Sequence, residues 1–184
     1  MADAPLARYR APALVFAGFL GVVAASAAVL FVSKLGGTPA RLAEHYRGAA
    51  ESFRAPRSLE GLLEVAVPHL LAIPLVLFAA SHVVGWARGV GRRTYRALVA
   101  LSFGAALTGI ASGFAVRFVA AELAWVKWAA FAALELTLLA WAGLLARVFL
   151  RTRSASAAVV AAGADAGSVT GGAPARRAAA PPRR

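Results

Sequence analysis

The stretch LLEVAVPHLLAIPLVLFAASHVVGW, residues 62–86, decides how this chain folds. It contains a single carboxylate, no Lys and no Arg, and most of its side chains are apolar. A helix of about 20 apolar residues crosses the ~30 Å hydrocarbon core of a bilayer. Since that core offers no partner for unpaired backbone groups, an open strand is excluded and a helix is expected. Residues 62–86 are therefore predicted to form a transmembrane helix.

Three further apolar segments flank this one, at residues 12–32, 97–116 and 125–150. Each approaches or exceeds the length needed to cross a bilayer. The first also resembles a signal peptide, because Ala25-Ser26-Ala27 is similar to a cleavage site. Its apolar run continues to Val32, however, which favours a retained helix. The sequence thus predicts an all-α membrane protein, a four-transmembrane-helix bundle over residues 12–150 with the lipid bilayer as its surroundings.

The composition restricts the chemistry open to the chain. Of its 184 residues, 60% are hydrophobic and none is cysteine. The absence of cysteine excludes thiolate zinc sites, iron–sulfur clusters and covalently attached c-type haem. The formal net charge is +12, but the basic residues lie at the ends of the apolar segments. This placement indicates membrane topology and argues against nucleic-acid binding.

The distribution of positive charge predicts the orientation. Thirteen of the 20 Lys and Arg residues lie before the first span, between the second and third spans, or around and beyond the end of the fourth. Basic residues accumulate on the cytoplasmic side of membrane proteins. The interpretation is a multi-pass protein of the bacterial inner membrane with both termini in the cytoplasm. Residues 1–11 then form a cytoplasmic N-terminus, and the connection 33–61 faces the periplasm.

Two segments outside the spans have recognisable features. Within the connection, Thr38 and Pro39 are typical of a helix start, and apolar residues at helical spacing predict a short amphipathic helix over residues 39–54. This helix either lies on the membrane surface or packs against the bundle. Residues 151–184 contain few large apolar side chains and several arginines, so a disordered basic cytoplasmic tail is expected.

Polar side chains inside the spans are the best candidates for function, because they are costly there. The second span carries Glu64, His69 and His82, and the fourth carries Glu135 near its centre. The two histidines are 13 residues apart, or about 19 Å along a helix, and are not expected to share one site. His69 and Glu135 are predicted at similar depths and in contact. Such a pair either locks two helices together or serves proton, ligand or cofactor chemistry.

The third span carries small residues at a four-residue interval. Ala105, Gly109 and Gly113 match the pattern that allows two helix backbones to approach closely. This pattern predicts tight helix packing, either within one chain or between two copies of it.

Several short motifs point to a known type of protein. They are KLGGTP at 34–39, EHYRG at 44–48, LLEV at 62–65 and PHL at 68–70. With these motifs the chain resembles a family of small, functionally uncharacterised four-helix proteins of the bacterial inner membrane. The resemblance extends over about residues 14–150 and implies a histidine-bearing second helix. It draws attention to Glu64, His69 and His82, and it implies no activity.

Three functions remain open at this stage. The favoured one is an accessory or structural subunit that associates with other membrane subunits or with itself as a homo-oligomer. The second is an electron-transfer subunit associated with haem b or quinone, for which His69 and His82 are the candidate ligands. The third is an oligomeric proton-coupled carrier that uses His69 and Glu135. Enzymatic activity is not favoured, because the sequence contains no nucleophile elbow, phosphate-binding loop or zinc-binding HExxH motif, and no metal site is expected.

Overall fold

The computed structural model describes residues 9–86 and 90–169, and this part of the chain is almost entirely helical. Its α-helices are α2 (Arg10–Leu35), α3 (Pro39–Arg47), α4 (Leu59–Trp86), α5 (Arg92–Phe118) and α6 (Ala124–Val169). Two short 3-10 helices, η1 (Ala50–Ser52) and η2 (Ala121–Leu123), lie between them. The prediction of an all-α helical bundle is confirmed.

Four of these segments are long and apolar enough to cross a membrane. They are Arg10–Leu35, Leu59–Trp86, Arg92–Phe118 and Ala121–Leu150, and each contains one of the predicted spans. Most side chains of these helices remain exposed within the protomer, as expected where lipid takes the place of water around the bundle.

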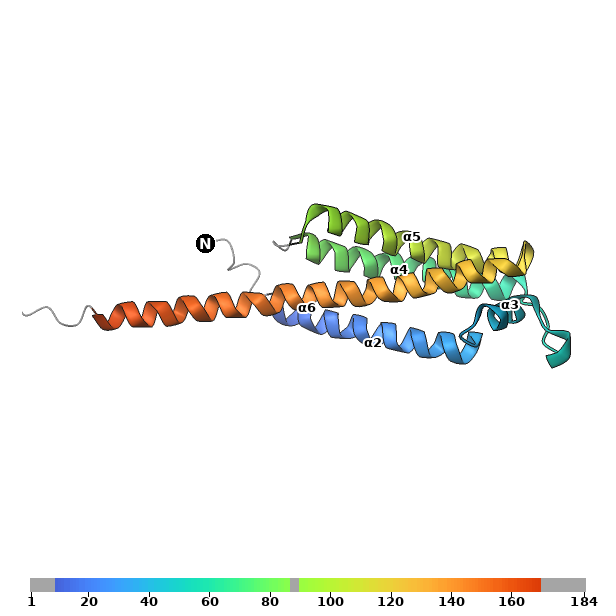
Figure 1. Ribbon diagram of the computed structural model, residues 1–184, viewed down its shortest axis with the longest axis horizontal. Coiled ribbons are helices and arrows are strands. Elements are labelled where there is room, and N and C mark those ends of the chain that lie inside the picture. Colours follow the sequence, from blue (N-terminus) through green and yellow to red (C-terminus); the bar gives the residue numbers. More distant parts are fainter. Residues whose placement is uncertain (1–8, 87–89, 170–184) are drawn as a thin grey trace, which may run out of the picture.

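Helix α6 is the centre of the bundle (Figure 1). It packs against α2 on one side and against α4 and α5 on the other, and α3 contacts its first turns. A large buried cluster joins α2, α4, α5 and α6, with Trp141, Leu145 and Phe149 of α6 almost completely enclosed. In water, the burial of each such side chain contributes about 1.5–3 kcal/mol to stability. In lipid, these side chains stabilise the bundle through close packing.

A second buried cluster lies at the opposite end of the bundle, under α3. All five α-helices contribute to this cluster. Its members are Phe31, Leu42, Tyr46, Leu62, Val116 and Ala124. We call residues 36–58, which close this end, the cap.

Local sequence explains where the cap's helix begins and ends. Thr38 accepts a hydrogen bond from the Arg41 backbone N–H through its Oγ1, at 3.4 Å, and Pro39 occupies the first helical position. The helix stops at Arg47, because Gly48 adopts a φ of +83°. A Cβ at Gly48 would lie 2.6 Å from the Arg54 carbonyl oxygen, so no other residue fits. The predicted helix over 39–54 was therefore too long by two turns.

The helix of the fourth span is longer than the span predicted for it. Helix α6 continues past the membrane-spanning segment to Val169, well beyond the other helices (Figure 1). Alanine is the best helix former, and an existing helix extends without a new nucleation step. The remainder of the predicted tail, residues 170–184, and residues 1–8 lie outside the described residues.

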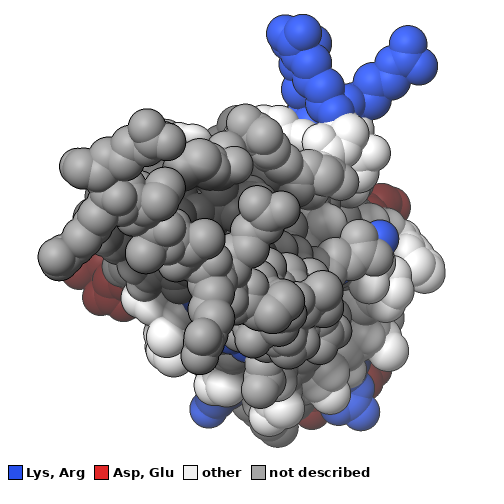
Figure 2. Space-filling model, turned by 90° about the vertical axis from the view of Figure 1, so that its left-hand side faces the viewer, with Lys and Arg blue, Asp and Glu red and all other residues white. Residues whose placement is uncertain are grey.

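The end of the bundle at which α5 begins is rich in exposed arginine. Arg92, Arg93 and Arg96 are exposed in the first turns of α5. Figure 2 looks at this end of the molecule and shows basic side chains projecting from it.

Candidate functional site

Helix α4 presents its polar side chains outward. Glu64, His69 and His82 are all exposed, whereas the buried positions of this helix hold apolar or small residues such as Leu62, Leu77 and Ala80. An exposed polar group on a membrane helix faces lipid unless another molecule covers it. Helix α4 therefore carries the candidate functional groups on surfaces that its own bundle does not use.

The ring of His69 has a defined tautomer. Its Nδ1 lies 2.6 Å from the Val65 carbonyl oxygen, one turn earlier on the same helix. A carbonyl oxygen can only accept, so Nδ1 carries the proton and donates. In the neutral ring Nε2 is then unprotonated and can only accept a hydrogen bond or bind a metal.

The structure does not bring His69 and Glu135 together. Glu135 is half-buried on α6, and no hydrogen bond or ion pair joins it to His69 within residues 9–86 and 90–169. The local bond to Val65 satisfies one polar atom of His69 without a second helix. In the described part of the chain, the predicted pairing of His69 with Glu135 is thus not accompanied by a hydrogen bond between them.

His82 lies in an aromatic environment at the other end of α4. Its ring centroid is 5.4 Å from that of Phe78 and 4.4 Å from that of Trp86, both on the same helix. His69 and His82 thus make separate local contacts, as their spacing predicts.

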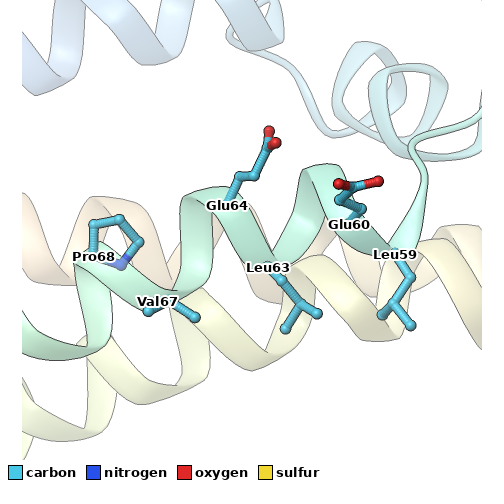
Figure 3. Close-up of a pocket in the computed structure, with 6 residues that line it drawn as sticks. All are labelled: Leu59, Glu60, Leu63, Glu64, Val67 and Pro68. Atoms are coloured by element: carbon cyan, nitrogen blue, oxygen red, sulfur yellow. The ribbon is translucent and has the colours of Figure 1, made fainter.

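Glu64 borders a depression of about 690 Å³ on the surface of α4 (Figure 3). Glu60 and Glu64 point to one side of it, and Leu59, Leu63 and Val67 point to the other. All of the lining residues belong to this one helix, so the depression is a surface feature and not an enclosed ligand cavity. Among the described residues no group of three His, Asp or Glu side chains gathers as a metal site.

The small residues of α5 make close contacts inside the protomer. Ala105 and Gly113 are buried, and a Cβ at Gly113 would lie 3.3 Å from the Tyr46 ring and hydroxyl. A Cβ at Gly109 would lie 3.9 Å from Ala130 of α6. These positions therefore admit α3 and α6 close to α5.

Lys127 is the polar residue whose role the sequence did not reveal. It is half-buried on α6, its Nζ donates to the Gly109 carbonyl oxygen on α5, and it lies 5.8 Å from the centroid of the Tyr46 ring. Two features of the sequence pointed to this role of Lys127. They are a lysine in the first turn of an apolar helix and the small-residue pattern of α5 that contains Gly109. The partners come from three helices, however, and no sequence spacing connects them.

Basic residues surround His45 on the outer side of the cap. Arg57 Nε donates to His45 Nε2 at 3.3 Å, and Arg117 Nε donates to the Arg57 carbonyl oxygen at 2.8 Å. Burial lowers the pKa of His45 below its ordinary value of 6.5, and the charges of Arg57, Arg54 and Lys127 lower it further. His45 is thus held neutral, and its Nε2 accepts a hydrogen bond within the cap.

Aromatic side chains connect α2, α6 and the cap at this end of the bundle. The Phe31 and Phe131 rings stack with their centroids 3.8 Å apart, and Trp128 Nε1 donates to the Gly37 carbonyl oxygen at 3.0 Å. Burial also raises the pKa of the Tyr46 hydroxyl, so this group stays neutral. The cap is thus a packed closure of this end of the bundle, and His45, Arg47 and Arg57 have hydrogen-bond partners within the chain.

These features define the class: a helical integral membrane protein whose four spans are closed at one end by a short packed helix. A family model described as a transmembrane helical domain matches residues 36–156, about two thirds of the chain. The chain belongs to this family, and the resemblance to small four-helix membrane proteins is confirmed. Neither the curated proteins nor the solved structures contain a match.

Proposed function

We propose that this chain is an accessory or structural subunit of a larger complex in the bacterial inner membrane, with both termini in the cytoplasm. The proposal rests on a stripe of exposed side chains along α4 that ends in a polar group at each end. The stripe consists of Glu64, Pro68, Leu71, Leu75, Phe78 and His82.

The spacing of these residues supports contact with another helix. They recur every three or four positions and so lie on one face of α4, away from its buried face. Helices associate in membranes through close packing and interhelical hydrogen bonds. A partner helix along the stripe would cover Leu71 and Leu75 and offer polar contacts to Glu64 and His82.

The orientation has its own support. The exposed Arg92, Arg93 and Arg96 lie in the first turns of α5, at the end of the bundle from which α6 extends (Figure 1). Under the positive-inside rule this is the cytoplasmic end, so the cap lies in the periplasm.

A proton-coupled carrier is less well supported. Such a carrier needs polar groups linked through the bundle, and His69 and Glu135 are not joined by a hydrogen bond. Neither of the surface depressions at Leu59–Pro68 and at Leu107–Val126 is lined by His69 or Glu135.

A pair of photo-cross-linking variants tests the docking role. Leu71 on α4 and Val15 on α2 are both 74% exposed, so they differ in helix and not in accessibility. A photoreactive phenylalanine analogue is placed at each position in the cells that make the protein. We expect position 71 to yield one discrete adduct with a different membrane protein and position 15 to yield lipid adducts alone.

Two outcomes would contradict the proposal. The same pattern from both positions would show that α4 has no preferred neighbour. An adduct at twice the chain's own mass of 18.9 kDa would identify a second copy of this chain as the neighbour, and not another subunit.

A further inference from the structure

We infer that residues 49–54, a loop at the tip of the cap, dock to a different protein outside the bilayer, one that offers an apolar pocket for the Phe53 ring and carboxylates for Arg54. We call this segment the tip loop. It is separate from the stripe on α4, and the inference does not depend on the docking role proposed above.

The tip loop has a defined backbone. Ala49 and Arg54 form an antiparallel bridge in which the backbone N–H of each donates to the carbonyl oxygen of the other at 3.1 Å. Between them, the Phe53 N–H donates to the Ala50 carbonyl oxygen at 3.2 Å, next to the single turn η1. These bonds order the loop before any partner arrives, which lowers the entropic cost of binding.

Phe53 adopts a backbone conformation that suits glycine better. Its φ is +51°, and among the described residues it is the one non-glycine residue with a positive φ. A residue with a Cβ is strained in this region, and such strain is concentrated at functional sites. The packing of the protomer does not explain the strain, because the Phe53 side chain is 97% exposed. The conformation therefore serves to present the ring to the surroundings.

Lipid around the spans does not account for the exposed ring. The other large hydrophobic side chains that are exposed among the described residues lie within the membrane-spanning helices or directly beside one. Phe53 precedes the nearest span, Leu59–Trp86, by six residues, and the segment after α3 lies past the ends of the spans (Figure 1). An aromatic ring outside both the bilayer and the core is suited to anchor a protein interface.

The charges around the tip loop indicate the chemistry of the partner. Arg54 is exposed beside Phe53. Burial lowers the pKa of the nearby His45, and the charges of Arg57 and Arg54 lower it further, so positive potential collects at the base of the loop. Glu51 is the carboxylate of the loop, and within residues 9–86 and 90–169 it forms no ion pair with either arginine. A partner with carboxylates around an apolar pocket would complement this surface.

A second copy of the chain would not provide this complement through the same loop. Two tip loops that meet around a twofold axis would bring Arg54 of one copy toward Arg54 of the other. Like charges across an interface oppose association. The occupant that the charges favour is therefore a different, acidic protein.

Photo-cross-linking in the cells that make the protein tests this partner. A photoreactive phenylalanine analogue replaces Ala50, which is exposed, so that Phe53 and Arg54 stay intact. We expect one adduct whose cross-linked peptide, identified by mass spectrometry, contains Asp or Glu and lies outside the membrane spans of its own protein. Phe53→Ala and Arg54→Glu should each lower the yield by about tenfold or more, as loss of an anchor residue does. Replacing the partner's carboxylate by Lys should restore the yield with Arg54→Glu.

Two controls accompany these variants. Arg41→Glu reverses an exposed arginine of α3 outside the tip loop and should leave the yield unchanged. Phe53→Ala should keep the helical content of the wild type by circular dichroism.

A measurement in vesicles distinguishes a protein partner from the lipid surface. Because the chain has no cysteine, Phe53→Cys and Trp125→Cys can each carry a single fluorophore in vesicles of phosphatidylcholine and phosphatidylglycerol. Lipids that bear a nitroxide should quench the label at position 125, in the first turn of α6, and not the label at position 53.

Several results would overturn the inference. They are the absence of an adduct, an adduct with lipid or with a second copy of this chain, equal yields from the wild type and Phe53→Ala, and equal quenching at positions 53 and 125. The adduct at position 71 of α4 reports on the docking role separately, so the two proposals can fail independently.

Discussion

Polar side chains in the cap and on the outer surface of α4 differ in whether other elements of the fold provide partners for them. In and beside the cap, His45 accepts a hydrogen bond from Arg57, the Arg57 carbonyl oxygen accepts one from Arg117, and Lys127 of α6 donates to Gly109 of α5. On α4, within the part of the chain that the structure describes, His69 bonds to its own helix alone and His82 contacts aromatic rings of its own helix alone. One region is completed by the fold, and the other presents its polar atoms to whatever lies outside.

This difference shows where to look for function in a small membrane bundle. A costly polar group that the fold satisfies is explained by stability, as Lys127 is. A costly polar group that the fold leaves facing lipid has no such explanation, and an external partner accounts for it. Variants of the cap and of the helices that pack on it test the first case. Variants of polar residues then test the contrast between groups that the fold satisfies and groups that it leaves exposed.

The largest expected effect comes from the centre of the cap. Tyr46 on α3 is buried against Gly113, whereas Phe53, also in the cap, is 97% exposed. Tyr46→Ala should lower the free energy of unfolding in detergent by about 3–4 kcal/mol, because it opens a cavity in a packed cluster. Phe53→Ala should leave it nearly unchanged. Equal effects of the two variants would show that the cap is not packed as described.

Two glycines of α5 provide the next comparison. A Cβ at Gly113 meets the Tyr46 ring at 3.3 Å, and a Cβ at Gly104 meets nothing within 4 Å. Gly113→Leu should therefore destabilise the protein by about 1–3 kcal/mol through overpacking, and Gly104→Leu should not. Denaturant titration of both variants measures the difference. A destabilised Gly104→Leu would instead place another helix against that position.

A smaller effect is expected from the polar residues of α6. Lys127→Met removes the hydrogen bond to Gly109 and should cost about 1–2 kcal/mol of folding free energy. Glu135→Leu removes a carboxyl group with no hydrogen-bond partner within residues 9–86 and 90–169, and should leave stability and assembly intact. Marked loss of folded protein in Glu135→Leu would assign that residue a structural role.

The smallest effect is a dependence of stability on pH. Because the pKa of His45 is lowered in the folded protein, the unfolded chain binds a proton more readily. Stability is therefore complete above the unfolded pKa of 6.5 and falls as the pH drops below it. Melting temperatures from about pH 8 to about pH 5 should decline less steeply in His45→Gln than in the wild type. Parallel curves would exclude His45 as the source.

Much of the fold follows from the sequence, because the length of an apolar run is a direct measure of its ability to cross a bilayer. The four spans and the helix start at Thr38 were predictable for this reason. The early stop at Gly48 was not, since it depends on the close approach of Arg54 and Pro56. The continuation of α6 beyond residue 150 agrees with the alanine-rich composition of that segment, because alanine is the best helix former.

The site was less predictable than the fold. The residue types and depths of His69 and Glu135 were evident, but the directions of their side chains were not. In a helix of a soluble protein, the apolar face packs on the core and the polar face meets water, so the sequence shows how the helix is rotated about its axis. In a membrane helix both the lipid side and the core side are apolar, so the sequence contains little information about rotation around the helix axis.

The contrast between His45 and His69 tests the account most directly. Since the chain has three histidines, a long-range ¹H–¹⁵N spectrum of histidine-labelled protein in detergent without added cofactor resolves every ring nitrogen. We predict protonated Nδ1 in both rings, a hydrogen-bonded Nε2 in His45 and a free, unprotonated Nε2 in His69. A protonated or hydrogen-bonded Nε2 in His69 would contradict the account, because the His69 ring would then not present a free acceptor to a partner molecule.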